Sequence, residues 1–199
     1  LQDVYDYTNL PFVAAGNPDL AQQLSQTLST RYTYTNTDKS TLIVGNVFLQ
    51  TADNYITNAT FIPVTQDSVL TPELTLKKGQ QLTKPVNLNG YVSLRSLLTF
   101  AMPLNFIRSN INFNAGVTYS KLPGIINYLE NTSKNLTYSL GAVIGSNVSQ
   151  YVDFTVTYNA NTSTVKKKLD PTQNNKYFSQ LVGVQFNLLP KQDGSFKTI

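Results

Sequence analysis

The chain has 199 residues, a net charge of +4 and a pI near 9.2, with 13% charged residues against roughly 25% in an ordinary soluble domain. It contains neither Cys nor His, which excludes disulfides, thiolate nucleophiles, zinc–thiolate sites and Ser-His-Asp or Cys-His catalysis within the chain. Its basic residues are scattered apart from one run of three lysines, so we expect no nucleic-acid binding. The abundance of Thr, Tyr and Phe favours strands, in one unit over residues 1–199.

In chain order, seven segments show the alternation of apolar and polar side chains that predicts β-strands. The alternation is cleanest in the fourth, fifth and sixth segments, and the second is apolar on both faces at first, so its register stays open. A helix over 20–28 competes with the first strand, but the Thr-Tyr-Thr-Tyr run that follows favours the strand. The seven segments are 24–35, 41–61, 91–102, 110–120, 135–145, 151–161 and 177–189.

Short and long connections alternate between these strands. The short ones are 36–40, 103–108, 146–150 and 190–195, after which Phe196 can begin an eighth strand, and the long ones are 62–88, 122–134 and 165–176. Short turns on one rim and long loops on the other are typical of an outer-membrane barrel. The sequence shows no signal peptide and no apolar run of the roughly 18 residues that a membrane helix needs.

The polar faces of the clean strands carry Ser, Thr, Asn and Gly, with Asp153 as the one charged residue. A sheet face in bulk water usually carries Lys, Glu and Arg, so small uncharged groups favour a barrel wall around a lumen. Arg31 and Arg95 fall on polar faces, where a lumen can hydrate them. We therefore predict an all-β fold of about seven to eight antiparallel up-and-down strands, forming part of an outer-membrane-type β-barrel. The alternative is a soluble, secreted β-sandwich or adhesin-like binding module, with a carbohydrate-active enzyme as a more distant third.

Three loop-to-strand passages carry a family resemblance. The segment 16–20 (GNPDL) precedes an alternating strand with a Tyr-rich end, 25–34, and follows 5–11 (YDYTNLP). Gly79-Gln80 and then 84–90 (KPVNLNG) open into a later strand. Over nearly its whole length the chain resembles the C-terminal barrel region of TonB-dependent-receptor-like outer membrane proteins of Bacteroidetes.

This resemblance implies a Gram-negative outer membrane location and a role in nutrient uptake or as a surface receptor. It implies the lipid bilayer, lipopolysaccharide and a small nutrient ligand as partners. Large transporters of this type have 22 strands. We therefore expect a segment of a larger barrel, with the remainder of the parent barrel and its plug as further partners and no plug domain present here.

Few side chains suggest a local site. Lys166, Lys167 and Lys168, in a predicted outer loop, either contact lipopolysaccharide phosphates or form a solvated loop cluster, and Lys77-Lys78 are interpreted in the same way. The carboxylates are not at metal-ligand spacing, so we assign no catalytic, cofactor-binding or metal-binding residue and expect no enzyme. Five Asn-X-Ser/Thr sequons, interpreted as products of the composition rather than glycosylation sites, begin at Asn58, Asn131, Asn135, Asn147 and Asn161.

Overall fold

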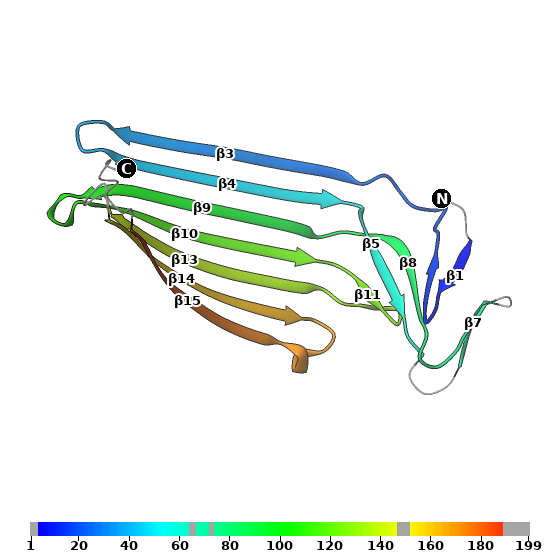
Figure 1. Ribbon diagram of the computed structural model, residues 1–199. Coiled ribbons are helices and arrows are strands. Elements are labelled where there is room, and N and C mark those ends of the chain that lie inside the picture. Colours follow the sequence, from blue (N-terminus) through cyan, green and yellow to red (C-terminus); the bar gives the residue numbers. More distant parts are fainter. Residues whose placement is uncertain (1–3, 64–66, 72–73, 147–151, 189–199) are drawn as a thin grey trace, which may run out of the picture.

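The computed structural model describes residues 4–63, 67–71, 74–146 and 152–188. Seven long strands form one antiparallel sheet in the order β15-β14-β13-β10-β9-β4-β3 (Figure 1). These strands are β3 (Leu24–Asn36), β4 (Thr41–Asp53), β9 (Tyr91–Leu104), β10 (Ser109–Leu122), β13 (Ser133–Ser146), β14 (Val152–Lys167) and β15 (Asn175–Leu188). The all-β, antiparallel character predicted from the alternation is confirmed.

Three details of the predicted fold differ from the structure. The described residues form fifteen strands, not seven or eight, and their sheets are open and do not close into a barrel. The predicted strand 41–61 is two strands, because Asn54 adopts a left-handed backbone with φ 50° and ends β4 before β5 begins. Part of the predicted long loop 62–88 also forms strands. Two runs of four and three residues are too brief to show alternation, whereas the run 81–88 alternates but contains Pro85, which disfavours a strand interior. The expected strand at Phe196 lies outside the described residues.

The strand register places the apolar stripes of all seven long strands on one face of the sheet. Residues that are directly opposite in an antiparallel pair point to the same side. Leu98 lies opposite Ala115, Ala115 opposite Leu140, and Leu140 opposite Ala160. Because each strand pairs independently, the common face follows from six separate registers, and a slip of one residue in any of them would break it.

A second, six-stranded sheet lies beyond the long-connection end of the first (Figure 1). Its order is β1-β2-β8-β5-β11-β12, with β2 parallel to β8 and β5 parallel to β11. A separate hairpin is formed by β6 (Ser68–Thr71) and β7 (Leu74–Leu76). The six strands are β1 (Tyr5–Asn9), β2 (Phe12–Ala15), β5 (Tyr55–Phe61), β8 (Gln81–Leu88), β11 (Ile125–Ile126) and β12 (Leu129–Glu130).

The main buried apolar cluster of the described residues is in this second region. Val13, Ala15 and Leu82 come from the second sheet and Leu76 from β7, and Tyr5 and Phe61 pack against them. Val13 and Leu76 are each 1% exposed. This small cluster fixes the second sheet and its hairpin, and it leaves both faces of the long sheet uncovered.

A two-stranded ribbon joins the two sheets: β4 pairs with β9, and their continuations β5 and β8 pair with each other. The two strands of this ribbon change order between the sheets. In the long sheet the neighbours run β3-β4-β9-β10, but in the second sheet their continuations run β2-β8-β5-β11. The strands that continue β4 and β9 have therefore exchanged places. This half-turn brings together two strands that both lead towards the long sheet, β2 and β8, which explains their parallel pairing.

Side-chain amides hold the chain where the strands exchange places. The Asn87 Nδ2 amide donates to the carbonyls of Ala21 (3.0 Å) and Asn54 (2.7 Å), and its Oδ1 accepts from the Ala21 N–H (2.7 Å). The Gln23 Oε1 accepts from the Ile56 N–H (2.9 Å). The strands cannot continue their ladders through a half-turn, so these amides satisfy backbone groups that the ladders leave unpaired.

The connections have the expected sidedness. Residues 37–40 and 105–108, the latter containing the 3-10 turn η1 (Asn105–Ile107), are short and lie at one end of the long sheet (Figure 1). Residues 54–63, 67–71, 74–90, 123–132 and 168–174, the last containing η2 (Pro171–Gln173), lie at the other end. The predicted short turn at 146–150 falls largely outside the described residues.

Candidate functional site: a two-faced sheet with a basic rim

The apolar face of the long sheet is open. Leu98 is 47% exposed, Leu140 50% and Val182 64%, although they lie on three different strands of the sheet. The solvent-accessible surface of the chain is 14073 Å², whereas a compact monomer of this mass has about 9,300 Å². The excess agrees with the exposure of these side chains, which shows that no second layer within the described residues covers this face.

The apolar stripe has a defined length. On β10 it runs from Ile111 to Tyr119, which is nine residues, and on β13 from Leu136 to Ile144, also nine. A tilted transmembrane β-strand crosses the hydrocarbon with about 9–11 residues. The stripe therefore matches one bilayer crossing, although the strands themselves are longer.

On β10, β13 and β14 the opposite face carries mostly small, uncharged polar side chains, whereas β4 adds Leu42, Val44 and Phe48 to it. Thr137 and Ser163 hydroxyls are 2.9 Å apart, the Ser163 hydroxyl donates to Asn135 Oδ1 (3.0 Å), and Thr99 donates to Asn114 Oδ1 (2.8 Å). These short side chains satisfy one another across strands. A face of this kind is compatible with a lumen that contains water and polar solutes.

Two arginines interrupt this uncharged face. Arg31 on β3 and Arg95 on β9 both line a hollow of about 420 Å³, together with Ser29, Phe48 and Thr118. Neither guanidinium pairs with another residue in the described part of the chain. The hollow therefore offers two free cationic forks beside hydroxyl groups, which is the chemistry that binds a carboxylate or a phosphate.

A row of lysines borders the apolar face at the long-connection end. Lys121 on β10 lies directly opposite Lys134 on β13, and Lys134 lies directly opposite Lys166 on β14. All three lie on the apolar side, two residues beyond the row of Tyr119 and Leu136. They line a hollow of about 410 Å³ with Thr132, Lys167 and Lys168.

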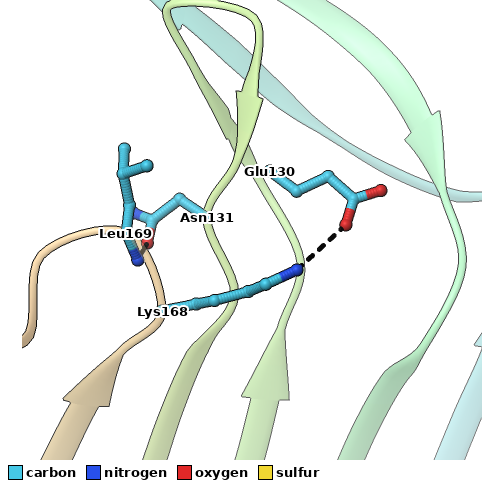
Figure 2. Close-up of polar contacts among 4 residues, drawn as sticks. All are labelled: Glu130, Asn131, Lys168 and Leu169. Carbon is cyan, nitrogen blue, oxygen red and sulfur yellow. Dashed lines mark hydrogen bonds and ion pairs between the residues drawn. The ribbon is translucent and has the colours of Figure 1, made fainter.

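The structure divides the predicted lysine run. Lys167 donates from its Nζ to Gln173 Oε1 (2.7 Å), and Lys168 forms an ion pair with Glu130 (3.4 Å) (Figure 2). The backbone of the next residue, Leu169, donates to Asn131 Oδ1 (3.3 Å). Lys166 has neither kind of partner within the described chain and instead joins the row. Of the three consecutive lysines, Lys166 thus belongs to the row with Lys121 and Lys134, whereas Lys167 and Lys168 bind residues of neighbouring connections.

Sequence reasoning missed Lys121 and Lys134. Each stands two positions outside an apolar stripe, Lys121 after Tyr119 and Lys134 before Leu136. The two lysines are at equal distances from the ends of the apolar stripes on two strands that one connection joins. This equality, which can be seen in the sequence, indicates that the two lysines lie side by side. Lys77 and Lys78, by contrast, lie near the β6–β7 hairpin, where the Lys78 N–H donates to Asp67 (2.8 Å).

The other sequence-based candidates are dispersed. Asn135 and Asn161 are on the polar face, Asn58 is on β5 and Asn131 is in the 123–132 connection, while Asn147 lies outside the described residues. No group of three or more Asp and Glu side chains able to hold a metal ion occurs in the described residues. Nor does any helix within residues 4–63, 67–71, 74–146 and 152–188 have the length and apolarity to span a membrane.

Two exposed carboxylates, Asp6 and Asp170, and one tyrosine, Tyr55, have shifted pKa values. Hydrogen bonds from the hydroxyl and the backbone N–H of Thr8 lower the pKa of Asp6. Hydrogen bonds from the Thr172 hydroxyl and from Gln173 lower the pKa of Asp170, which caps η2. Burial, and then the proximity of Tyr91, raises the pKa of Tyr55, whose ring stacks on that of Tyr91 at 4.2 Å between centroids. Asp170 and Tyr55 both stabilise connections at the long-connection end.

Comparisons with protein-family models, curated proteins and solved structures find no match to this chain.

Proposed function

We propose that this chain is a section of the wall of an outer-membrane β-barrel in a Gram-negative bacterium. The parent is proposed to be a TonB-dependent-receptor-like protein of the Bacteroidetes type, acting in nutrient uptake or as a surface receptor. The observation that carries the proposal is the single apolar face of seven strands, aligned by six registers and open to the surroundings.

The size of that face favours lipid as its neighbour. Seven strands at about 4.8 Å each and nine residues at about 3.3 Å each give an area of roughly 1,000 Å². The largest apolar patch on a soluble monomer is usually about 300–600 Å². A β-sandwich would cover such a face with a second sheet, but the second sheet here lies beyond the strand ends (Figure 1).

The polar face supports a transport or receptor role. Its hydroxyls and amides suit a hydrated lumen or a plug, and the hollow beside Arg31 and Arg95 suits a small anionic nutrient. The long connections at one end correspond to the extracellular loops of such barrels. The unpaired edges, β3 and β15, are where the remainder of the parent barrel would join.

Single-cysteine labelling tests the proposal directly, because the natural chain has no Cys. The full chain is refolded into phosphatidylcholine vesicles, with one nitroxide label at a time along residues 111–119 of β10. We expect accessibility to oxygen, which partitions into lipid, to peak at Phe113, Ala115 and Val117, and accessibility to a water-soluble nickel reagent to peak between them.

A chain that folds cooperatively as a monomer in water, without lipid or detergent, overturns the proposal. So does a label pattern without two-residue periodicity in vesicles. A matched control is the same scan along the exposed residues 6–9 of β1, which lies in the second sheet and should be accessible to the nickel reagent throughout.

A further inference from the structure

The row of Lys121, Lys134 and Lys166 is unusual for its lack of counter-charges. Like charges that are directly opposite in a sheet destabilise it, and here two such pairs are adjacent. Among the described residues, none of these three ammonium groups has an ion-pair or hydrogen-bond partner. The carboxylate of Glu130, on the 123–132 connection, pairs with Lys168 instead (Figure 2).

We propose that the row binds the phosphate groups of an anionic lipid headgroup in the leaflet that surrounds the long-connection end. The proposal rests on the proposed function, since it requires the apolar face to contact lipid. It goes beyond that function by identifying one binding site, its three residues and its ligand chemistry.

The geometry suits phosphate. Directly opposite residues have Cβ atoms about 4.5–5.5 Å apart, so the row spans roughly 10 Å and can hold one or two phosphate groups. Lys121 also shows where the ammonium groups extend: a Cβ built on Gly90, just before β9 begins, would lie 3.1 Å from Lys121 Nζ. The side chain therefore extends past the strand end, as a lysine does when its stem lies on apolar surface and its charge reaches a polar layer.

The position along the strands is that of a headgroup layer. The lysines lie two residues, about 7 Å, beyond the row of Tyr119 and Leu136. The apolar stripe ends there, so acyl chains against the stripe would bring their headgroups level with the lysines. Lys176 on β15 lies on the same face, opposite Thr164, and extends the basic surface towards the sheet edge.

The test uses the full chain in neutral detergent micelles. Binding of lipid A that carries its phosphates is compared with binding of the same lipid after enzymatic removal of those phosphates, so that the acyl chains are matched. The triple variant Lys121→Gln, Lys134→Gln, Lys166→Gln is compared with a control of equal charge change, Lys39→Gln, Lys77→Gln, Lys78→Gln.

We expect the phosphorylated lipid to bind more tightly, and the triple variant to lose about 100-fold in affinity, at about fivefold for each lysine. The control variant should keep the affinity of the natural chain. Inorganic phosphate at concentrations matched to the lipid should fail to compete, because the proposed ligand is a headgroup held in a lipid layer.

Equal binding of both lipids, or equal losses in the two variants, overturns the inference. Full competition by inorganic phosphate would identify a free-phosphate site and overturns it as well. These failures are distinguishable from failure of the proposed function. The test of the proposed function measures oxygen accessibility along β10 in vesicles of neutral phosphatidylcholine. Those vesicles contain no anionic lipid, so its result does not depend on the three lysines.

Discussion

The backbone amide of Asn54 donates a 2.9 Å hydrogen bond to the side-chain carbonyl of Asn89, across the point where two strands exchange places. Asn54 has φ 50° and the next residue after Asn89, Gly90, has φ 94°. Each of the two strands of the ribbon therefore has one residue with left-handed backbone dihedral angles, and these two residues lie side by side. Asn and Gly are the residues that enter this region most easily, so the half-turn is encoded locally on both strands.

Replacing Asn54 tests the importance of this turn. We expect Asn54→Val to lower the free energy of unfolding by about 1–2 kcal/mol, because a β-branched residue disfavours the left-handed region. Asn54→Gly keeps that region accessible and should have a much smaller effect. Denaturant unfolding in detergent micelles measures both, and equal losses in the two variants would contradict this explanation.

Placing one charge on either face of β13 separates lipid from lumen. Leu140 lies at the centre of the apolar stripe and its neighbour Ser139 is on the polar face. We expect Leu140→Arg to weaken folding into vesicles by about 2–4 kcal/mol, as for an arginine near the bilayer midplane. Ser139→Arg places its charge on the polar face, beside Arg31 and Arg95, and should cost clearly less, about 1 kcal/mol. Similar losses of folding free energy in the two variants would mean that the two faces do not lie in different environments, one lipid and one water.

Close packing on the polar face gives a third prediction. A Cβ on Gly116 would lie 2.5 Å from the Ser139 hydroxyl oxygen and 3.4 Å from the Ser96 carbonyl oxygen. We expect Gly116→Ala to cost about 1–3 kcal/mol, and Ser139→Ala in the same chain to recover part of that cost. A double-mutant cycle should give a coupling energy of at least about 0.5 kcal/mol, and strict additivity would exclude this contact as the cause.

The stacked tyrosines predict a pH dependence at alkaline pH. Burial and Tyr91 raise the pKa of Tyr55 above its ordinary value near 10. The folded state therefore favours the neutral phenol, so this stabilisation is complete below pH 10 and is lost as the pH rises through the folded-state pKa. Unfolding measured from pH 8 to 12 should show less alkaline loss of stability in Tyr55→Phe than in the natural chain, and Tyr7→Phe serves as the control.

The sequence predicted the long strands well because alternation is a local property. In β10, β13 and β14 each residue indicates its own face, and the short connections on one side bring neighbours together. Strand ends differ from the prediction by a few residues, as with β14, which continues to Lys167 instead of ending near Asn161. The ends depend on pairing with the next strand, which local alternation does not encode.

The second sheet could not be predicted in the same way. β2 pairs with β8 and β5 with β11 across long stretches of chain, through segments as short as two residues. Strands of two residues, such as β11, are too short for a period to appear. The offsets of Lys121 and Lys134 were visible in the sequence, but Lys166 joins their row only because β14 continues past its predicted end and pairs in register with β13.

The count of long strands has a consequence for how the sheet can be completed. Seven antiparallel strands place β3 and β15 in the same direction, both running from the long-connection end to the short-turn end. Direct contact between these edges would create a parallel seam, and so would a second copy joined edge to edge with its loops on the same side. An antiparallel closed wall, which in bacterial single-chain barrels has an even number of strands, therefore requires an odd number of additional strands between β15 and β3.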